Sequence, residues 1–577
     1  MSGATWDEEF DVVVIGSGGG GLVAGLAARE AGGSALVVEK RDLIGGSTAM
    51  SGGVVWLPNN PLMQRDGVAD SDEDGLRYFA ETVGEVGPAS SPERREAFIS
   101  EGREMVRFLE ERGARFTRCE NYSDYYSNRP GGSAIGRSIE PLPYDGRQLG
   151  EWLPRVQPGM AMGLGMNVMT NELRDVQYVN RSLRSFVIAA RVQLRTWRSS
   201  LMKRPVLTNG TALVASVLKM CLDRGVEVRT GTAFEEYVVE DGVVTGVRLR
   251  AGDTVRTVRA RRGVVVAAGG FAHNPELREE FGGTQLPDPS WSIANPGDTG
   301  DTVAATLKLG AKTDFMDEAW WLPGPPRALS GGTLSAARNR PRTIIVGADG
   351  KRFANESNSY VELGKAMFAR NKTTAAVPAW LIFDDGYRRA YAHTRSLFFG
   401  RLPKEWLASS EFKQASTLSE LAAKCGIDAA GLHEQVARFN TYASEGKDPQ
   451  FGRGESEYNH CLGDPNRRIP NPAVGPLDKG PFYAFPIYPS DVGTCGGFLT
   501  DEFGRVIAED GPVPGLYATG NGTATVMGRH YLGAGASIAN TMIFGFIAAR
   551  HAMGAGDGAG TGPGREGRRQ RGARAGT

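Results

Sequence analysis

The chain has 577 residues, of which 41% are hydrophobic and 23% charged, and its formal net charge is +0. This length exceeds what one hydrophobic core usually organises, so we expect at least two domains. The balanced charge gives no electrostatic basis for nucleic-acid binding. The five cysteines have neither metal-ligand nor disulfide spacing, the acidic first residues do not resemble a secretory signal, and no apolar run is long enough to span a bilayer. We therefore expect a cytoplasmic protein without a metal site.

The first forty residues predict a dinucleotide-binding unit. An apolar strand over 12–15 leads through a glycine-rich turn into a helix, and a second strand follows over 35–38. The glycines in the G-x-G-x-x-G spacing are Gly16, Gly18 and Gly21. Such glycines let the backbone approach a pyrophosphate at the N-terminus of a helix, and Glu39 at the end of the second strand would hold a ribose.

Three further clusters of small residues indicate FAD, rather than NAD, as the cofactor. "KRDLIGGSTAMSGGVVW" follows Glu39, and its small and hydroxyl side chains suit a ribityl chain and a flavin ring. Two apolar strands, in 262–274 and 515–526, end in glycine, as strands that border a dinucleotide do. No histidine follows the glycine pair at 45–46, so we expect FAD to bind non-covalently. The residues predicted to contact FAD are Gly16, Ser17, Gly18, Gly19, Gly20, Gly21, Glu39, Lys40, Gly45, Gly46, Ser47, Thr48, Ser51, Gly52, Gly53, Ala233, Ala268, Gly269, Gly270, Gly520, Asn521, Gly535, Ser537 and Ile538.

Between these segments, residues 225–270 read as short strands that form a meander and return to the sheet. The turns carry Asp241-Gly242 and Gly252-Asp253, which favour hairpins. A nucleotide motif, a meander and a strand ending in Gly-Gly occur in this order in flavoproteins with two dinucleotide-binding folds.

From Asp11 to about Met553 the sequence resembles the 3-ketosteroid Δ1-dehydrogenases of the fumarate reductase/succinate dehydrogenase-like flavoprotein superfamily. The stretches that carry this resemblance are "YSDYYSNRPGG" (122–132), "GKRFANESNSY" (350–360), "FYAFPIYPSDVGTCGG" (482–497) and "GRHYLGAGAS" (528–537). It implies an α/β fold in which a discontinuous Rossmann-like FAD-binding domain carries an inserted α+β catalytic domain. It also implies an oxidoreductase of steroid degradation that acts on CH–CH groups and passes its electrons to an external acceptor such as a quinone.

The resemblance further implies four site residues. Tyr125, Tyr360 and Tyr531 match the catalytic tyrosines of that family, and Gly535 matches the glycine whose N–H faces the substrate carbonyl. Tyr531 and the Gly535 amide would stabilise negative charge on the 3-oxo oxygen while Tyr360, assisted by Tyr125, takes the C2 proton. The hydride from C1 would pass to flavin N5.

Three other interpretations stay open. Tyr488 and Ser490 resemble the pair used by the Δ4-(5α)-dehydrogenases, which desaturate C4–C5, although packing at a strand edge also explains them. A fumarate-reductase-like activity needs basic residues that bind two carboxylates, and here only Arg529 and His530 lie in a catalytic-looking stretch. A flavin-binding protein without enzymatic activity is the third alternative, against which the complete set of four site residues argues.

The resemblance and the composition together predict the domain organisation. The FAD-binding domain would comprise 1–318 and 478–555, the catalytic domain 319–477, and a disordered Gly- and Arg-rich tail 556–577.

Residues 155–205 look like an insertion that contains an amphipathic helix. Its apolar residues recur at helical spacing, namely Phe186, Ala190, Leu194, Trp197 and Leu201, among seven basic residues. The segment 160–204 would either contact the inner face of the cell membrane or dock on its own protein or at a dimer interface. The methionines at its start, Met160, Met162, Met166 and Met169, would form an apolar lid.

Overall fold

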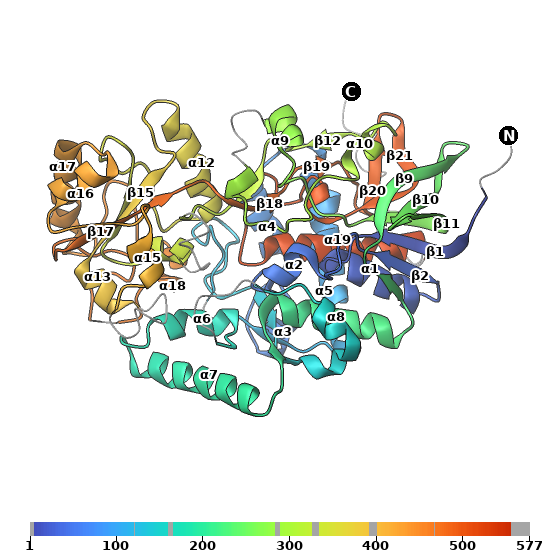
Figure 1. Cartoon of the computed structure of the whole chain (residues 1–577), viewed down its shortest axis with the longest axis horizontal. Coiled ribbons are helices and arrows are strands. Elements are labelled where there is room, and N and C mark those ends of the chain that lie inside the picture. Colours follow the sequence, from blue (N-terminus) through green and yellow to red (C-terminus); the bar gives the residue numbers. More distant parts are fainter. Residues whose placement is uncertain are drawn as a thin grey trace, which may run out of the picture.

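The computed structural model describes residues 5–120, 122–159, 166–282, 289–325, 334–391, 401–466 and 468–554. Figure 1 shows two sheets at opposite ends of the molecule, with the helix α19 (Ala536–Ala552) in the same half as the larger sheet. The predicted tail, 556–577, lies outside the described residues.

The larger sheet has the strand order β20-β21-β11-β1-β2-β8, with β9 and β10 attached through β11. Its strands are β1 (Glu8–Ile15), β2 (Ala35–Val38), β8 (Glu227–Arg229), β9 (Ala233–Glu240), β10 (Val243–Ala251), β11 (Thr254–Val266), β20 (Arg505–Ala508) and β21 (Gly511–Ala518). Strand β1 pairs in parallel with β2 and β11, and β11 pairs in parallel with β21. The carboxyl ends of these parallel strands therefore meet at one edge, where a dinucleotide binds in such sheets.

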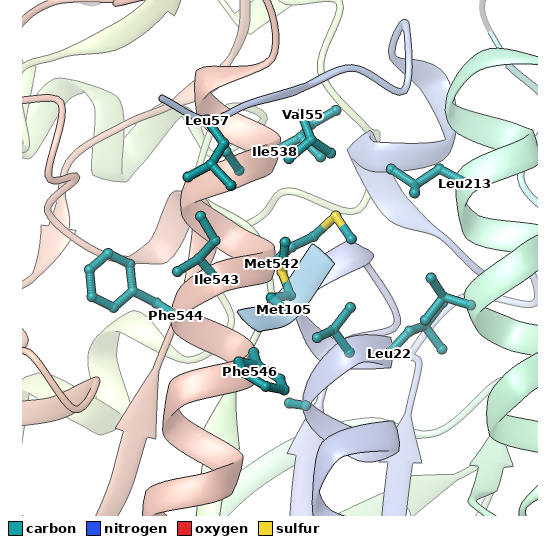
Figure 2. Close-up of a cluster of buried hydrophobic side chains, with 14 of the residues drawn as sticks. Leu22, Val55, Leu57, Met105, Leu213, Ile538, Met542, Ile543, Phe544 and Phe546 are labelled. Carbon is teal, nitrogen blue, oxygen red and sulfur yellow. The ribbon is translucent and has the colours of Figure 1, made fainter. Parts of the chain in front are cut away.

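Helices α1 (Gly19–Glu30) and α19 pack together beside this sheet. Figure 2 shows Leu22 of α1 and the α19 side chains among residues from distant segments, such as Met105 and Leu213, all of them buried. The two helices approach closely because glycines face each other: a Cβ on Gly545 would lie 2.4 Å from the carbonyl oxygen of Gly20. This contact holds the N-terminal end of α1 against the middle of α19.

The second sheet is antiparallel, with the order β14-β15-β17-β16. Its strands are β14 (Thr343–Val346), β15 (Ala379–Asp384), β16 (Lys413–Ala415) and β17 (Phe482–Ile487). The helices α12 (Tyr360–Asn371), α16 (Leu418–Cys425) and α17 (Ala429–Ala443) accompany it, and apolar clusters form on both of its faces. This sheet includes β17, which lies beyond residue 477.

The predicted amphipathic helix is present as α7 (Leu183–Leu201), at the rim of the molecule in Figure 1. It packs on α6 (Thr170–Gln177) through a small cluster that contains Val176 and Val192. Its apolar stripe faces outward, and Leu194, Trp197 and Leu201 are 58–66% exposed. Met160 and Met162 lie outside the described residues, whereas Met169 is buried. No helix in the described ranges combines the length and the apolar character needed to cross a bilayer.

Candidate functional site

The described residues line a cavity of about 370 Å³ between the two halves of the fold. Its walls come from the carboxyl ends of β1, β2, β11 and β21, from the N-termini of α1 and α19, and from the first residues of α6 and α12. One part of the wall is backbone and small side chains, and the other is aromatic.

At the glycine-rich part, the backbone takes conformations that only glycine adopts easily. Gly16 has a φ of +107°, and a Cβ there would lie 2.2 Å from the carbonyl oxygen of Ala267. Gly18 caps the N-terminus of α1, whose partial positive charge points at the cavity. The Glu39 carboxylate accepts hydrogen bonds from Ser17 Oγ (2.6 Å) and from the N–H of Arg41 (3.0 Å), which fix its position at the end of β2.

The second glycine cluster folds beside the first. The short helix α2 (Gly46–Met50) begins after Gly45, which has a φ of +112°, and Thr48 Oγ1 accepts the N–H of Gly19 at 3.0 Å. Ser47 Oγ accepts the N–H of Asn295 at 3.2 Å. The segments 46–52 and 293–298 therefore form adjoining parts of the same wall.

Most residues predicted to contact FAD line this cavity: Gly16, Ser17, Gly18, Glu39, Lys40, Gly46, Ser47, Thr48, Ser51, Gly52, Ala268, Gly269, Gly520, Asn521, Gly535, Ser537 and Ile538. Those outside its lining are Gly19, Gly20, Gly21, Gly45, Gly53, Ala233 and Gly270. Several of the latter permit close packing behind the wall instead. A Cβ on Gly21 would lie 2.0 Å from the carbonyl oxygen of Gly16, and one on Gly270 would lie 2.0 Å from Thr494 Oγ1.

At the aromatic part, the three predicted tyrosines converge from distant segments. Tyr125 lies in a turn, Tyr360 is the first residue of α12, and Tyr531 precedes α19. Their ring centroids are 5.3–5.5 Å apart, and all three line the cavity. Tyr125 Oη donates a hydrogen bond to Tyr360 Oη at 3.3 Å, and Tyr531 Oη is 3.0 Å from Ser537 Oγ.

Burial dominates the electrostatics of this cluster. It raises the pKa of both Tyr125 and Tyr360 well above the ordinary phenol value, because a phenolate is poorly solvated there. The hydrogen bond from Tyr125 lowers the pKa of Tyr360 and so opposes part of this rise. Within the pair, Tyr360 is therefore the acceptor of the hydrogen bond and the better site for a negative charge.

Gly535 lies at the mouth of α19 with a φ of +93°, and a Cβ there would lie 2.2 Å from the carbonyl oxygen of Val54. Among the groups that the structure describes, we find no acceptor for its N–H. The cavity thus contains a main-chain donor at a helix N-terminus close to Tyr531, an arrangement that can stabilise an oxyanion.

The residues that supported other interpretations lie elsewhere. The ring of Tyr488 packs on Trp291 at 4.9 Å, Ser490 Oγ donates to the carbonyl of Trp291 at 2.7 Å, and neither lines the cavity. These contacts are those expected of the packing interpretation of this pair. Arg529 forms ion pairs with Asp317 (2.9 Å) and Glu318 (2.8 Å) rather than facing the cavity.

Sequence patterns missed several residues of the lining, among them Asn295, Asp298 and Trp320. Burial raises the pKa of Asp298 to about 7. Trp320 meets Tyr531 edge-on at 5.1 Å and donates from Nε1 to Asn521 Oδ1 at 3.0 Å. The glycine- and polar-rich "SIANPGDTGD" (292–301) could have indicated the first two, whereas nothing around Trp320 distinguishes it from a core residue.

Comparisons with known proteins agree with this geometry. The model of the family described as "FAD binding domain" matches residues 11–538. The chain is 40% identical over 558 residues to the 3-oxosteroid 1-dehydrogenase of Mycobacterium tuberculosis, covering 94% of this chain and 98% of that protein. A solved structure of the 3-ketosteroid delta1-dehydrogenase of Sterolibacterium denitrificans, in complex with 1,4-androstadiene-3,17-dione, superposes with a TM-score of 0.88. The match is 34% identical and covers 95% of this chain and 100% of that one. The 3-ketosteroid-delta4-(5alpha)-dehydrogenase of Rhodococcus jostii is 23% identical with a TM-score of 0.63, covering 96% and 98%, and shares the fold.

Proposed function

We propose, since the chain belongs to the FAD binding domain family and is a close relative of 3-oxosteroid 1-dehydrogenases, that it introduces a C1–C2 double bond into ring A of 3-oxo steroids. The observation that carries the proposal is the convergence of Tyr125, Tyr360 and Tyr531 with the Gly535 amide on one cavity. The related solved structure contains a steroid that has this double bond.

The glycine-rich part of the cavity fits FAD. Gly16 and Gly18 leave room for a pyrophosphate beside the N-terminus of α1, and Glu39 is positioned for a ribose. Bound there, FAD supplies the acceptor for the hydride that leaves C1. Non-covalent binding is supported by the described lining residues, among which there is neither a histidine nor a cysteine.

In this mechanism, the chain's own residues handle the proton and the charge. Tyr531 Oη and the Gly535 N–H hydrogen-bond the 3-oxo oxygen, which becomes negative as the C2 proton leaves. Tyr360 takes that proton, while Tyr125 donates a hydrogen bond to its oxygen. The electron pair left on C2 forms the new double bond as the hydride departs from C1. With FAD bound, an external acceptor such as a quinone would take up the two electrons of each turnover.

Product analysis tests this proposal directly. The purified holoprotein is incubated with 4-androstene-3,17-dione and with its 5α-reduced analogue plus an artificial acceptor, and the new double bond is located by NMR. We expect C1–C2 desaturation of both steroids. A C4–C5 double bond formed only in the 5α-reduced compound would favour the Δ4-(5α) alternative. Reduction of fumarate by the reduced protein would favour the fumarate-reductase alternative. If neither steroid reduced the flavin and fumarate did not oxidise it, the result would contradict an enzymatic role.

We also propose a division of the chain into a discontinuous FAD-binding domain and an inserted catalytic domain. The presence of β1, β11 and β21 in one sheet supports the first part of this proposal. The antiparallel sheet supports the second, and because it includes β17, the proposed insertion ends near residue 487 rather than 477.

We further propose that α7 contacts the inner surface of the cell membrane. Its outward stripe carries leucine, phenylalanine and tryptophan, which insert at the headgroup boundary of a bilayer. Five exposed basic residues accompany the stripe and have no ion pair within the described chain: Arg184, Arg191, Arg198, Lys203 and Arg204. An anionic lipid surface would complement these charges.

The position of α7 would bring the membrane surface close to the cavity. Helix α6, on which α7 packs, begins at Thr170, and this residue lines the cavity. A steroid dissolved in the bilayer would therefore reach the site across one helix.

Vesicle sedimentation tests the membrane proposal. We expect the holoprotein to sediment with phosphatidylglycerol vesicles and the double variant Leu194→Glu/Trp197→Glu to stay in the supernatant. Leu407→Glu, at a leucine 60% exposed in the separate helix α15 (Lys404–Ala408), is the matched control and should sediment like the parent. No sedimentation of the parent would contradict the proposal, and a parent dimer that the double variant converts to a monomer would favour the dimer interface.

A further inference from the structure

A base built from buried phenols has an electrostatic difficulty. To take a proton from carbon, Tyr360 must first lose its own, yet burial raises its pKa well above the ordinary value of about 10. The hydrogen bond from Tyr125 relieves only part of this rise. A positive charge within a few ångströms would stabilise the phenolate.

A buried arginine, Arg338, is bound to the turn that precedes Tyr360. It belongs to the 3₁₀ helix η5 (Leu334–Asn339) and is 3% exposed. Its Nη1 donates to the carbonyl oxygen of Asn358 at 2.8 Å and to that of Glu356. These carbonyls belong to the turn that leads into α12, so the guanidinium is fixed at the turn that precedes Tyr360, the first residue of this helix.

The surroundings of Arg338 differ from those of its charged neighbours. Arg352 pairs with Glu356 and Asp448, and Arg453 lies 3.3 Å from Glu356. These two arginines and two carboxylates balance each other. Within the described residues Arg338 has no carboxylate partner, and its Nε finds no hydrogen-bond acceptor.

Phenols take the place of the missing carboxylate. The groups that interact electrostatically with Arg338 are Tyr458, Tyr125 and Tyr360. The ring of Tyr458 packs on that of Tyr125 at 4.4 Å, and Arg338 opposes the burial that raises the pKa of Tyr458. A buried cation without a counter-ion favours ionisation of whichever of these phenols can release its proton.

Other ionisable groups near the cluster do not replace this charge. Tyr531 and Cys461 are neutral when protonated, and Glu356 is matched by Arg352 and Arg453. On the far side of α12, Lys365 and Arg529 are matched by Glu318 and Asp317, while Glu362 accepts a hydrogen bond from Tyr126. Arg174, which donates to the carbonyl oxygen of Cys461 at 2.6 Å, acts on Tyr122 and Tyr178. Among the described residues, Arg338 is the cation without a carboxylate partner that acts on Tyr125 and Tyr360.

We propose that Arg338 is a positioning residue for the reaction, a fixed buried cation that stabilises the phenolate of the Tyr125–Tyr360 pair and so makes Tyr360 a base near neutral pH. This inference rests on the proposed role of Tyr360 in 3-oxo steroid dehydrogenation. It requires no movement of Arg338, because main-chain carbonyls hold the guanidinium in place.

Two measurements on the holoprotein with Arg338→Gln test the proposal. The first is the pH dependence of flavin reduction by steroid in a single turnover, and the second is the ultraviolet absorbance of phenolate during titration without steroid. We expect the acid limb of the first and the phenolate midpoint of the second to move up together by about 1–3 pH units, the effect of removing an opposite charge at close range. Arg338→Lys should restore part of both shifts.

The control is Arg340→Gln, two residues along the chain. Arg340 is also buried and lies over the rings of Tyr178 and Tyr391, which are outside the cavity lining. A merely structural role predicts similar effects of both substitutions on flavin reduction, whereas the proposal predicts that Arg340→Gln leaves the acid limb of flavin reduction unchanged, because the phenols beside Arg340 lie outside the cavity lining. If Arg338→Gln does not retain FAD, Arg338→Met, which also removes the charge, takes its place in both measurements.

The two readouts separate this inference from the proposed function. A phenolate midpoint that stays in place when Arg338 is replaced would overturn the proposal, whatever the activity. A shifted midpoint in a protein that oxidises no 3-oxo steroid would support the role of Arg338 in phenol ionisation and contradict the proposed reaction.

Discussion

The two parts of the cavity wall are built in different ways. The glycine-rich part depends on main-chain geometry within short stretches, so that Gly16, Gly18 and Glu39 lie within one strand-turn-helix-strand unit. The tyrosine part depends on side chains that meet only after the chain has folded, since Tyr125, Tyr360 and Tyr531 come from three distant segments. Substitutions that add atoms at the glycine-rich part should therefore impair cofactor binding, whereas substitutions that remove atoms at the tyrosine part should impair catalysis.

The largest effect is expected at Gly16. In Gly16→Ala the new Cβ would meet the carbonyl of Ala267 at 2.2 Å on a backbone with positive φ, so the purified protein should lack FAD and all turnover. The ratio of flavin to protein absorbance measures this. Gly32→Ala is the control, because Gly32 also has a positive φ but has no atom within 4 Å of the added Cβ, and it should retain FAD. Equal flavin content in Gly16→Ala and Gly32→Ala would contradict the prediction that an atom added at Gly16 prevents FAD binding.

Replacing Tyr360 tests the other part of the wall. Tyr360→Phe should keep FAD and the fold but lower the rate of flavin reduction by about 10²–10⁴, the usual contribution of a positioned base. Stopped-flow measurement of flavin absorbance gives this rate. Tyr126→Phe removes a hydroxyl that donates to Glu362 outside the cavity and should react like the parent. A Tyr360→Phe protein as fast as that control would show that another group takes the proton.

Tyr531→Phe should have a somewhat smaller effect. Loss of one of two oxyanion donors typically lowers turnover by about 10²–10³, while the Gly535 N–H still binds the carbonyl. The same single-turnover assay applies, with FAD content as the check on folding. Full activity of Tyr531→Phe would indicate that Tyr531 only packs against Trp320, whose ring centroid lies 5.1 Å from its own.

The smallest effect concerns stability at the border of the tyrosine part. Glu140 in β5 (Ser138–Pro141) is buried, accepts the N–H groups of Thr170 and Asn171 at 2.8 and 2.9 Å, and has its pKa raised by burial to about 7. Because the folded-state pKa lies above the unfolded one, its contribution is complete below about pH 4.3 and is lost as the pH rises through 7. Glu140→Gln should remove up to about 3 kcal/mol of this pH dependence. Thermal unfolding of the holoprotein and of Glu140→Gln at pH 5 and pH 8 measures this pH dependence. If the melting temperature changed by the same amount between the two pH values in both proteins, the assignment of this pH dependence to Glu140 would be wrong.

The sequence predicted the glycine-rich part better than its surroundings. Gly16, Gly18 and Glu39 belong to a local sequence pattern. That pattern does not distinguish glycines that face a ligand from glycines that face another part of the chain. Gly20 and Gly21 were therefore expected to line the cavity, whereas in the structure they permit close packing. The tyrosines were found through a family resemblance rather than through spacing. Arg338 has no local signal, because its importance arises from a missing carboxylate, which only the folded arrangement reveals.

The proposed contact of α7 with the membrane would have a kinetic consequence. An enzyme held at an interface meets a lipid-dissolved substrate in two dimensions, so its rate follows the mole fraction of steroid in the bilayer rather than the amount per volume of buffer. Adding inert phospholipid at a fixed quantity of steroid should then slow turnover by surface dilution. The Leu194→Glu/Trp197→Glu variant, which meets only the steroid dissolved in buffer, should be slower than the parent at equal lipid and steroid content.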